Sequence, residues 1–141
     1  MVLKNKKFKK TVSILGSTGS IGKSTIDLIM RNPETFDIVA LTAQTNVKIL
    51  AQQARIVKPN LVVIGDHSKY KELKNSLLGT NIEVASGKEA LNEAAGRKSD
   101  WTMVAIVGIA GLLPTIQAIK NGQTIALANK ECLVSAGEIF N

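Results

Sequence analysis

The sequence predicts a protein of the α/β class, with a doubly wound, mostly parallel sheet that carries helices on both faces. Short β-branched runs alternate along the chain with amphipathic segments, which is the pattern of this architecture. The run at residues 61–64 is apolar throughout, as expected for a strand that is covered on both faces. The first apolar run passes directly into a glycine-rich turn at residues 16–22, and an amphipathic helix follows. Together these features predict a Rossmann-like fold.

The predicted strands are short apolar runs: residues 11–15, 38–41, 61–64, 82–84, 103–107 and 124–127. Helices are predicted between and after them: residues 20–31, 47–57, 68–77 and 88–95, a helix from residue 112 to Asn121-Gly122, and a final helix after residue 131. The first helix places Ile26, Ile29 and Met30 on one face, and these side chains are expected in the core. Proline ends the first two helices, at Pro33 and before Pro59.

A single domain is predicted at residues 11–141, after a basic tail at residues 1–10. The chain of 141 residues shows no internal repeat, low-complexity segment or linker. Its net charge of +7 is concentrated in the tail, which holds five lysines. Aromatic residues make up only 4% of the chain, so the basic charge predicts a solvated tail and no nucleic-acid partner.

The composition also indicates where the protein works. No apolar run approaches the about 18 residues that span a bilayer, and the N-terminus lacks the apolar region of a secretory signal. Cys132 is the single cysteine, which excludes an internal disulfide bond and suits a reducing compartment. We therefore expect a cytoplasmic protein without a membrane partner.

The glycine-rich turn and the helix start that follows it predict an anion site. Glycines let the backbone approach a phosphate, and the first N–H groups of a helix point at it. In doubly wound sheets, ligands bind at the carboxyl ends of the strands, where the strand order reverses. The loops expected there share glycine and uncharged polar residues: residues 16–22, 42–46, 108–111 and 128–131. We expect Ser20 to cap the helix while the neighbouring backbone binds phosphate.

One interpretation of this turn is a nucleotide triphosphatase with a P-loop. Gly22-Lys23-Ser24 fits the end of that pattern, but the first required glycine falls at Ser17. Asp66, after an apolar run, imitates a magnesium-binding aspartate and fits a turn equally well. A guanine-reading motif at residues 129–132 fails at Cys132.

The other interpretation is a dinucleotide site. Gly16, Gly19 and Gly22 can serve as the turn, close-approach and helix-packing glycines of such a site. NAD sites usually place an acid at the end of the second strand, but residues 42–46 contain none. Amide and hydroxyl donors there, with Lys48 nearby, suit a 2′-phosphate, so the pattern favours NADP over NAD.

Three stretches, in order along the chain, resemble the N-terminal domain of the 1-deoxy-D-xylulose 5-phosphate reductoisomerase family: GSTGSIG at residues 16–22, IVGIAGLLPT at residues 106–115 and LANKE at residues 127–131. The resemblance runs from about Thr11 to the end of the chain. That family uses NADPH and a divalent metal (Mn, Mg or Co). It isomerises and reduces 1-deoxy-D-xylulose 5-phosphate to 2-C-methyl-D-erythritol 4-phosphate in non-mevalonate isoprenoid biosynthesis.

The resemblance implies roles for particular residues. Thr18, Gly19, Ser20 and Ile21 would surround the cofactor pyrophosphate, and Gly16 in the same turn is also expected to bind the cofactor. Those at the adenosine ribose and its 2′-phosphate would be Gln44, Thr45 and Asn46, where some members carry Gly-Lys in place of Gln44-Thr45. Asn129 and Glu131 would border the nicotinamide, and Lys130 would reach the sugar-phosphate substrate.

The family's metal ligands and most of its substrate contacts lie in a second domain, downstream of the LANKE motif. We therefore expect this chain to hold no metal site and no complete catalytic set, and to be inactive alone. The full-length family enzyme is expected to be a homodimer. A P-loop-like nucleotide triphosphatase and a non-catalytic nucleotide-binding module are the alternatives.

Overall fold

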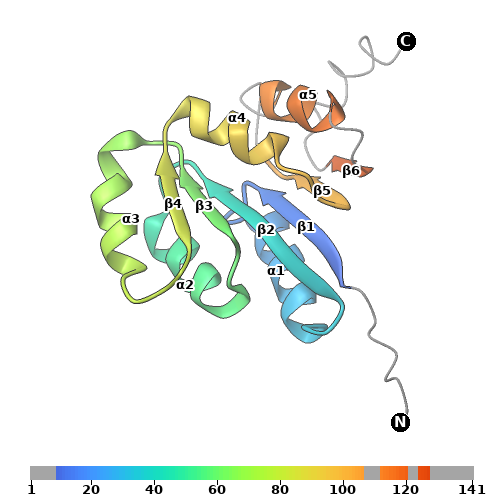
Figure 1. Ribbon diagram of the computed structural model, residues 1–141, viewed down its shortest axis with the longest axis horizontal. Coiled ribbons are helices and arrows are strands. Elements are labelled where there is room, and N and C mark those ends of the chain that lie inside the picture. The colour runs from blue at the N-terminus through green and yellow to red at the C-terminus, as the bar shows by residue number, and fades with distance from the viewer. Residues whose placement is uncertain (1–8, 107–111, 121–123, 128–141) are drawn as a thin grey trace.

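The computed structural model describes residues 9–106, 112–120 and 124–127. The strands form one sheet in which every neighbouring pair is parallel, in the order β4-β3-β2-β1-β5-β6 (Figure 1). The strands are β1 (Lys10–Leu15), β2 (Phe36–Ala43), β3 (Leu61–Ile64), β4 (Glu83–Ser86), β5 (Trp101–Val104) and β6 (Thr124–Leu127). The helices are α1 (Ser20–Arg31), α2 (Val47–Val57), α3 (Tyr70–Ser76), α4 (Lys88–Gly96) and α5 (Leu112–Lys120), with a 3₁₀ turn η1 (His67–Lys69) before α3.

Both faces of the sheet are covered, as predicted. Helices α1 and α2 lie on one face, and α4 lies on the other (Figure 1). Strand β3 shows the arrangement clearly, because successive side chains of a strand point to opposite faces. Val62 and Ile64 pack in a core with residues of α1, α2 and α3, whereas Leu61 and Val63 pack with Ala94 of α4.

The strand order reverses beside β1. From β1 the chain builds outward through β2, β3 and β4, and α4 then carries it back to β5 on the other side of β1. The loops after β1 and β5 therefore diverge at the carboxyl ends of these strands, which is where doubly wound sheets bind their ligands. Within the described part of the chain, no helix is long and apolar enough to cross a membrane.

Two predicted strands have ends that differ from the prediction by one to three residues. The run predicted at residues 82–84 forms β4 at Glu83–Ser86, and the run predicted at residues 103–107 forms β5 at Trp101–Val104. Each takes its limits from its neighbour, since β4 pairs along the four residues of β3, and β5 pairs with the last four residues of β1. Pairing across the sheet therefore determines where these strands begin and end, and the apolar runs in the sequence predict those limits only approximately.

Two further details of the helices differ from the expectation. Met30 is 43% exposed and does not join the core. The buried face of α1 is formed by Gly22, Ile26 and Ile29. Met30 is rotated by about 100° around the helix from Ile29, and so it lies at the edge of this face. The helix predicted at residues 68–77 begins as the 3₁₀ turn η1, and its α-helical part is Tyr70–Ser76. The predicted final helix lies outside the described residues.

Candidate nucleotide-binding site

A hollow of about 330 Å³ lies at the carboxyl ends of β1, β2 and β5. Its lining comes from the turn after β1, the end of β2, the segment after β5 and α4: Gly16, Thr18, Gly19, Thr42, Ala43, Gln44, Leu91, Ala105 and Ile106. The structure thus brings together two of the loops predicted from the sequence, residues 16–22 and 42–46. The other two, residues 108–111 and 128–131, lie outside the described residues.

Gly16 makes the turn that opens this hollow. Its φ of +85° lies in the left-handed region that favours glycine, and a Cβ there would stand 2.8 Å from the carbonyl oxygen of Ala105. Its N–H donates to both the carbonyl oxygen and Oγ1 of Thr42, each at 3.0 Å. The turn is therefore held between the ends of β2 and β5.

The other two glycines of the turn differ in their surroundings. A Cβ on Gly22 would lie 2.5 Å from the carbonyl carbon of Ser17, so α1 packs directly on the turn. A Cβ on Gly19 would meet only the carbonyl oxygen of Gly16, at 3.9 Å. Gly22 thus permits close packing within the protein, whereas the space above Gly19 is open. Open space at a helix start is what the approach of a phosphate requires.

The prediction that Ser20 caps α1 is wrong. The N-cap is Gly19, whose extended backbone (φ −76°, ψ 177°) already has the geometry of a cap, so Ser20 is the first helical residue. Within the described part of the chain, no side-chain capping bond is made at this end, and the first turn contains no acid. Ser24 Oγ donates backward to the carbonyl oxygen of Ser20, and Thr25 Oγ1 to that of Ile21. Among the residues that the structure describes, no side chain therefore neutralises the positive end of α1.

Ser17, which stands where a P-loop requires its first glycine, is fully buried. Its Oγ donates to Oε1 of Gln53 at 2.7 Å, and Nε2 of Gln53 donates to the carbonyl oxygen of Ser17 at 2.9 Å. We did not predict a role for Gln53 from the sequence. A signal was present, because Gln53 interrupts the apolar face of α2 between Leu50 and Ala54.

At the end of β2 the side chains of Gln44, Thr45 and Asn46 are exposed. Asn46 caps α2, with Oδ1 accepting from the N–H of Ile49 at 3.1 Å. The side chain of Gln44 lies over Gly65, where a Cβ would stand 2.7 Å from Cδ of Gln44. No acid occurs at residues 42–46, as the sequence already indicated.

The side chain of Asp66, the residue that imitates a magnesium-binding aspartate, is hydrogen-bonded within its own turn. Oδ1 accepts from the backbone N–H of Ser68 at 3.0 Å and from Oγ of Ser68 at 2.7 Å. These two bonds, first the one from the hydroxyl and then the one from the backbone, hold the pKa of the Asp66 carboxyl below its usual value. Among the residues that the structure describes, no group of three His, Cys, Asp or Glu side chains is placed to hold a metal ion.

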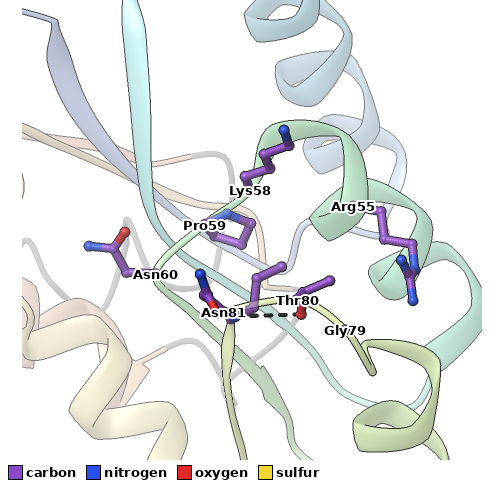
Figure 2. Close-up of a pocket in the computed structure, with 8 residues that line it drawn as sticks. Arg55, Lys58, Pro59, Asn60, Gly79, Thr80 and Asn81 are labelled. Carbon is purple, nitrogen blue, oxygen red and sulfur yellow. Dashed lines mark hydrogen bonds between the residues drawn. The ribbon is translucent and has the colours of Figure 1, made fainter.

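A larger hollow, of about 600 Å³, lies at the opposite ends of the strands (Figure 2). Its lining residues precede β3 and β4 or belong to the end of α2: Arg55, Lys58, Pro59, Asn60, Gly79, Thr80, Asn81 and Ile82. Arg55 is engaged there, since Nε donates to the carbonyl oxygen of Ser76 and Nη2 to that of Leu78. This hollow lies at the amino ends of the strands, away from the position where such sheets bind nucleotides. The smaller hollow is therefore the candidate site.

The structure places the remaining predicted residues as follows. Ile21 is 46% exposed and, like Ser20, lies on the first turn of α1 without lining the hollow. Asn129, Lys130 and Glu131 lie outside the described residues. Of the residues predicted around a cofactor, Gly16, Thr18, Gly19 and Gln44 meet in one hollow.

Comparisons with known proteins agree with one another. The family model described as 1-deoxy-D-xylulose 5-phosphate reductoisomerase matches residues 12–137. The reductoisomerase of this name from Rhizobium meliloti (strain 1021) is 54% identical over 134 residues, which are 94% of this chain and 34% of the relative. The chain spans about a third of the length of the curated relatives it matches.

Two solved structures are similar over the same part. One is described as 1-deoxy-D-xylulose 5-phosphate reductoisomerase from Zymomonas mobilis in complex with NADPH, with a TM-score of 0.91, 52% identity, and coverage of 94% of this chain and 35% of that one. The other, DOX-P reductoisomerase in complex with NADPH, fosmidomycin and magnesium, has a TM-score of 0.85 and 38% identity, and covers 91% of this chain and 32% of that one. The chain belongs to the 1-deoxy-D-xylulose 5-phosphate reductoisomerase family.

Proposed function

We propose that this chain is the NADPH-binding part of a 1-deoxy-D-xylulose 5-phosphate reductoisomerase and that the hollow above Gly19 receives the cofactor. The observation that carries the proposal is the open space over Gly19 at a helix start that no side chain caps. A relative that is 52% identical is described in complex with NADPH, which supports the same assignment.

The turn after β1 would hold the pyrophosphate through Thr18, Gly19, Ser20 and Ile21, with Gly16 shaping the turn. Backbone N–H groups and the positive end of α1 provide a favourable environment for a diphosphate without requiring a basic side chain. When bound, NADPH supplies the hydride that the reduction requires.

The end of β2 would hold the adenosine ribose and its 2′-phosphate through Gln44, Thr45 and Asn46. Because Oδ1 of Asn46 caps α2, its Nδ2 group is the part that can donate to a phosphate oxygen. The absence of an acid at residues 42–46 avoids repulsion of the 2′-phosphate, and the exposed Lys48 adds a nearby positive charge.

The remaining parts of the proposal concern the whole enzyme. Asn129 and Glu131 would border the nicotinamide, and Lys130 would contact the sugar phosphate. The full-length protein would isomerise and reduce 1-deoxy-D-xylulose 5-phosphate with a divalent metal, as a cytoplasmic homodimer. The expected metal ligands belong to a further domain, so we infer that residues 1–141 alone bind cofactor without turning over substrate.

Isothermal titration calorimetry of the chain with NADPH, NADH and ATP tests the proposed function. We expect NADPH to bind at least ten-fold more tightly than NADH, a difference of about 1.4 kcal/mol or more, because only NADPH carries the 2′-phosphate. Tighter binding of ATP than of NADPH would support the nucleotide triphosphatase alternative instead. Equal affinities for NADPH and NADH would remove the assignment of a 2′-phosphate site to the end of β2.

A further inference from the structure

Gln53 and Ser17 form a buried polar pair beneath the candidate site. Gln53 is 6% exposed, and Ser17 is completely buried. The pair shares two hydrogen bonds, one from Oγ of Ser17 to Oε1 of Gln53 at 2.7 Å and one from Nε2 of Gln53 to the carbonyl oxygen of Ser17 at 2.9 Å. The second bond joins a side chain of α2 to the backbone of the turn, 36 residues away along the chain.

This backbone bond determines which way one peptide group faces. The peptide between Ser17 and Thr18 is planar and trans, so its C=O and its N–H point in opposite directions. With the Ser17 carbonyl directed toward Gln53 on α2, the N–H of Thr18 points away from α2. Thr18 lines the hollow and Gln53 does not. Among the residues that the structure describes, no acceptor is bonded to this N–H.

The neighbouring N–H groups of the turn are already engaged. Those of Gly16 and Ser17 both donate to the carbonyl oxygen of Thr42, at 3.0 and 2.8 Å. The N–H of Thr18 is therefore the first group of the turn that no described residue engages, and we take it as the group available to a ligand. A rotation of this peptide would turn the Ser17 carbonyl oxygen toward the hollow, where it would repel a phosphate.

We propose that Gln53 is a positioning residue: by holding the Ser17 carbonyl, it directs the N–H of Thr18 into the site, where it donates to the pyrophosphate of the cofactor. The proposal rests on the proposed function, because it requires that a pyrophosphate binds above Gly19. A glutamine suits this task because its amide both donates and accepts, and so satisfies both groups of Ser17 in a buried place.

Three variants separate this role from simple packing. Gln53→Met keeps the length of the side chain and removes both hydrogen bonds. Ser17→Ala removes the hydroxyl bond alone and leaves the bond from Nε2 to the carbonyl oxygen. Gln52→Met changes the exposed neighbour on the same helix and serves as the control.

We expect Gln53→Met to weaken NADPH binding about ten-fold or more, since it misplaces a hydrogen bond to a charged group. Ser17→Ala and Gln52→Met should stay within about three-fold of the unmodified chain. Equal binding by Gln53→Met and the unmodified chain would overturn the proposal. An equal loss in Ser17→Ala and Gln53→Met would also overturn it, because the carbonyl bond would then not be the one that matters.

A measurement on the unmodified chain keeps the proposal testable even if Gln53→Met fails to fold. In ¹H–¹⁵N spectra, NADPH should shift the Thr18 amide strongly downfield, as expected for a new hydrogen bond to a phosphate. If NADPH binds and the Thr18 amide does not move, the role of Gln53 is refuted while the proposed function stands. If NADPH does not bind the unmodified chain at all, the proposed function itself fails.

Discussion

At the scale of single residues, each of the three glycines in the turn occupies its position for a different physical reason. Gly16 adopts a left-handed backbone beside Ala105, and Gly22 allows α1 to pack against Ser17. Gly19 has neither constraint, because its backbone is extended and its Cβ position is open. Folding alone therefore does not explain a glycine at residue 19, whereas the approach of a phosphate would explain it.

Gly19→Val and Gly22→Ala should therefore affect different properties. Gly19→Val should weaken NADPH binding at least ten-fold, because its side chain fills the space of the phosphate, and should cost less than about 1 kcal/mol of stability. Gly22→Ala should lower the free energy of unfolding by roughly 1–3 kcal/mol, because the turn backbone cannot retreat from the added methyl group. Calorimetry and urea unfolding of both variants measure the two effects.

The contrast between the two variants is the control. Normal NADPH binding by a folded Gly19→Val protein would show that the glycine turn is not part of the cofactor site. A Gly22→Ala protein as stable as the original would mean that α1 does not pack on the turn as closely as the structure indicates.

At the scale of elements, α2 supports the site from two positions, its N-terminus and its middle. Its N-cap, Asn46, lies at the end of β2 beside the expected 2′-phosphate, and Gln53 in its second half reaches back to the turn after β1. One helix thus connects the two loops between which a dinucleotide would lie. The loops keep their relative positions because Leu50 and Ala54 of α2 are fully buried in the core.

Two substitutions of Asn46 separate capping from ligand binding. Asn46→Ala should cost about 1 kcal/mol of stability, because the N–H of Ile49 loses its partner. Asn46→Asp should keep the cap and gain slightly from the helix dipole, but should repel a 2′-phosphate. We expect its preference for NADPH over NADH to fall several-fold, as measured by titration of both nucleotides. An unchanged preference would place the 2′-phosphate elsewhere.

At the scale of the whole molecule, the strand order brings together segments far apart in the sequence. Strands β1 and β5 are neighbours, and Asp100 joins their starts across 89 residues. Oδ2 of Asp100 accepts from the backbone N–H of Thr11 at 2.9 Å and from its Oγ1 at 3.1 Å. These bonds, the backbone bond first, hold the pKa of Asp100 below its usual value.

This lowered pKa predicts a pH dependence of stability. A carboxyl whose pKa is lower in the folded protein contributes stability above its unfolded pKa and loses it as the pH falls through the folded pKa. The unmodified chain should therefore be more stable than Asp100→Asn at neutral pH. The difference should shrink over roughly pH 5 to pH 2, as urea unfolding at each pH would measure.

The comparison with Asp100→Asn isolates this one group. Asp66 also has a lowered pKa, but it is present in both proteins, so its effect cancels in the difference. A difference in stability that is constant across this pH range would mean that the ionised carboxyl of Asp100 does not stabilise the contact between β1 and β5.

Much of the fold and part of the site were predictable from the sequence. The limits of α1, β3 and β6 were predicted closely, because strong apolar patterns, glycines and prolines act locally. The limits of β4 and β5 were not, because pairing with β3 and β1 decides them. Ser20 was predicted as the helix cap from residue preference alone, whereas the backbone conformation of Gly19 makes Gly19 the cap.

The sequence by itself determined the α/β class, the glycine turn before α1, the acid-free end of β2 and the family, since all of these follow from the kinds of residue and their order along the chain. Only the tertiary structure distinguished the packing glycine Gly22 from the open Gly19, and it alone paired Gln53 with Ser17. These distinctions depend on which atoms face each other across the fold. The pairing of Gln53 with Ser17 joins segments 36 residues apart, and the contact of Gly22 with Ser17 depends on how the turn folds back on α1, so no sequence pattern contains either.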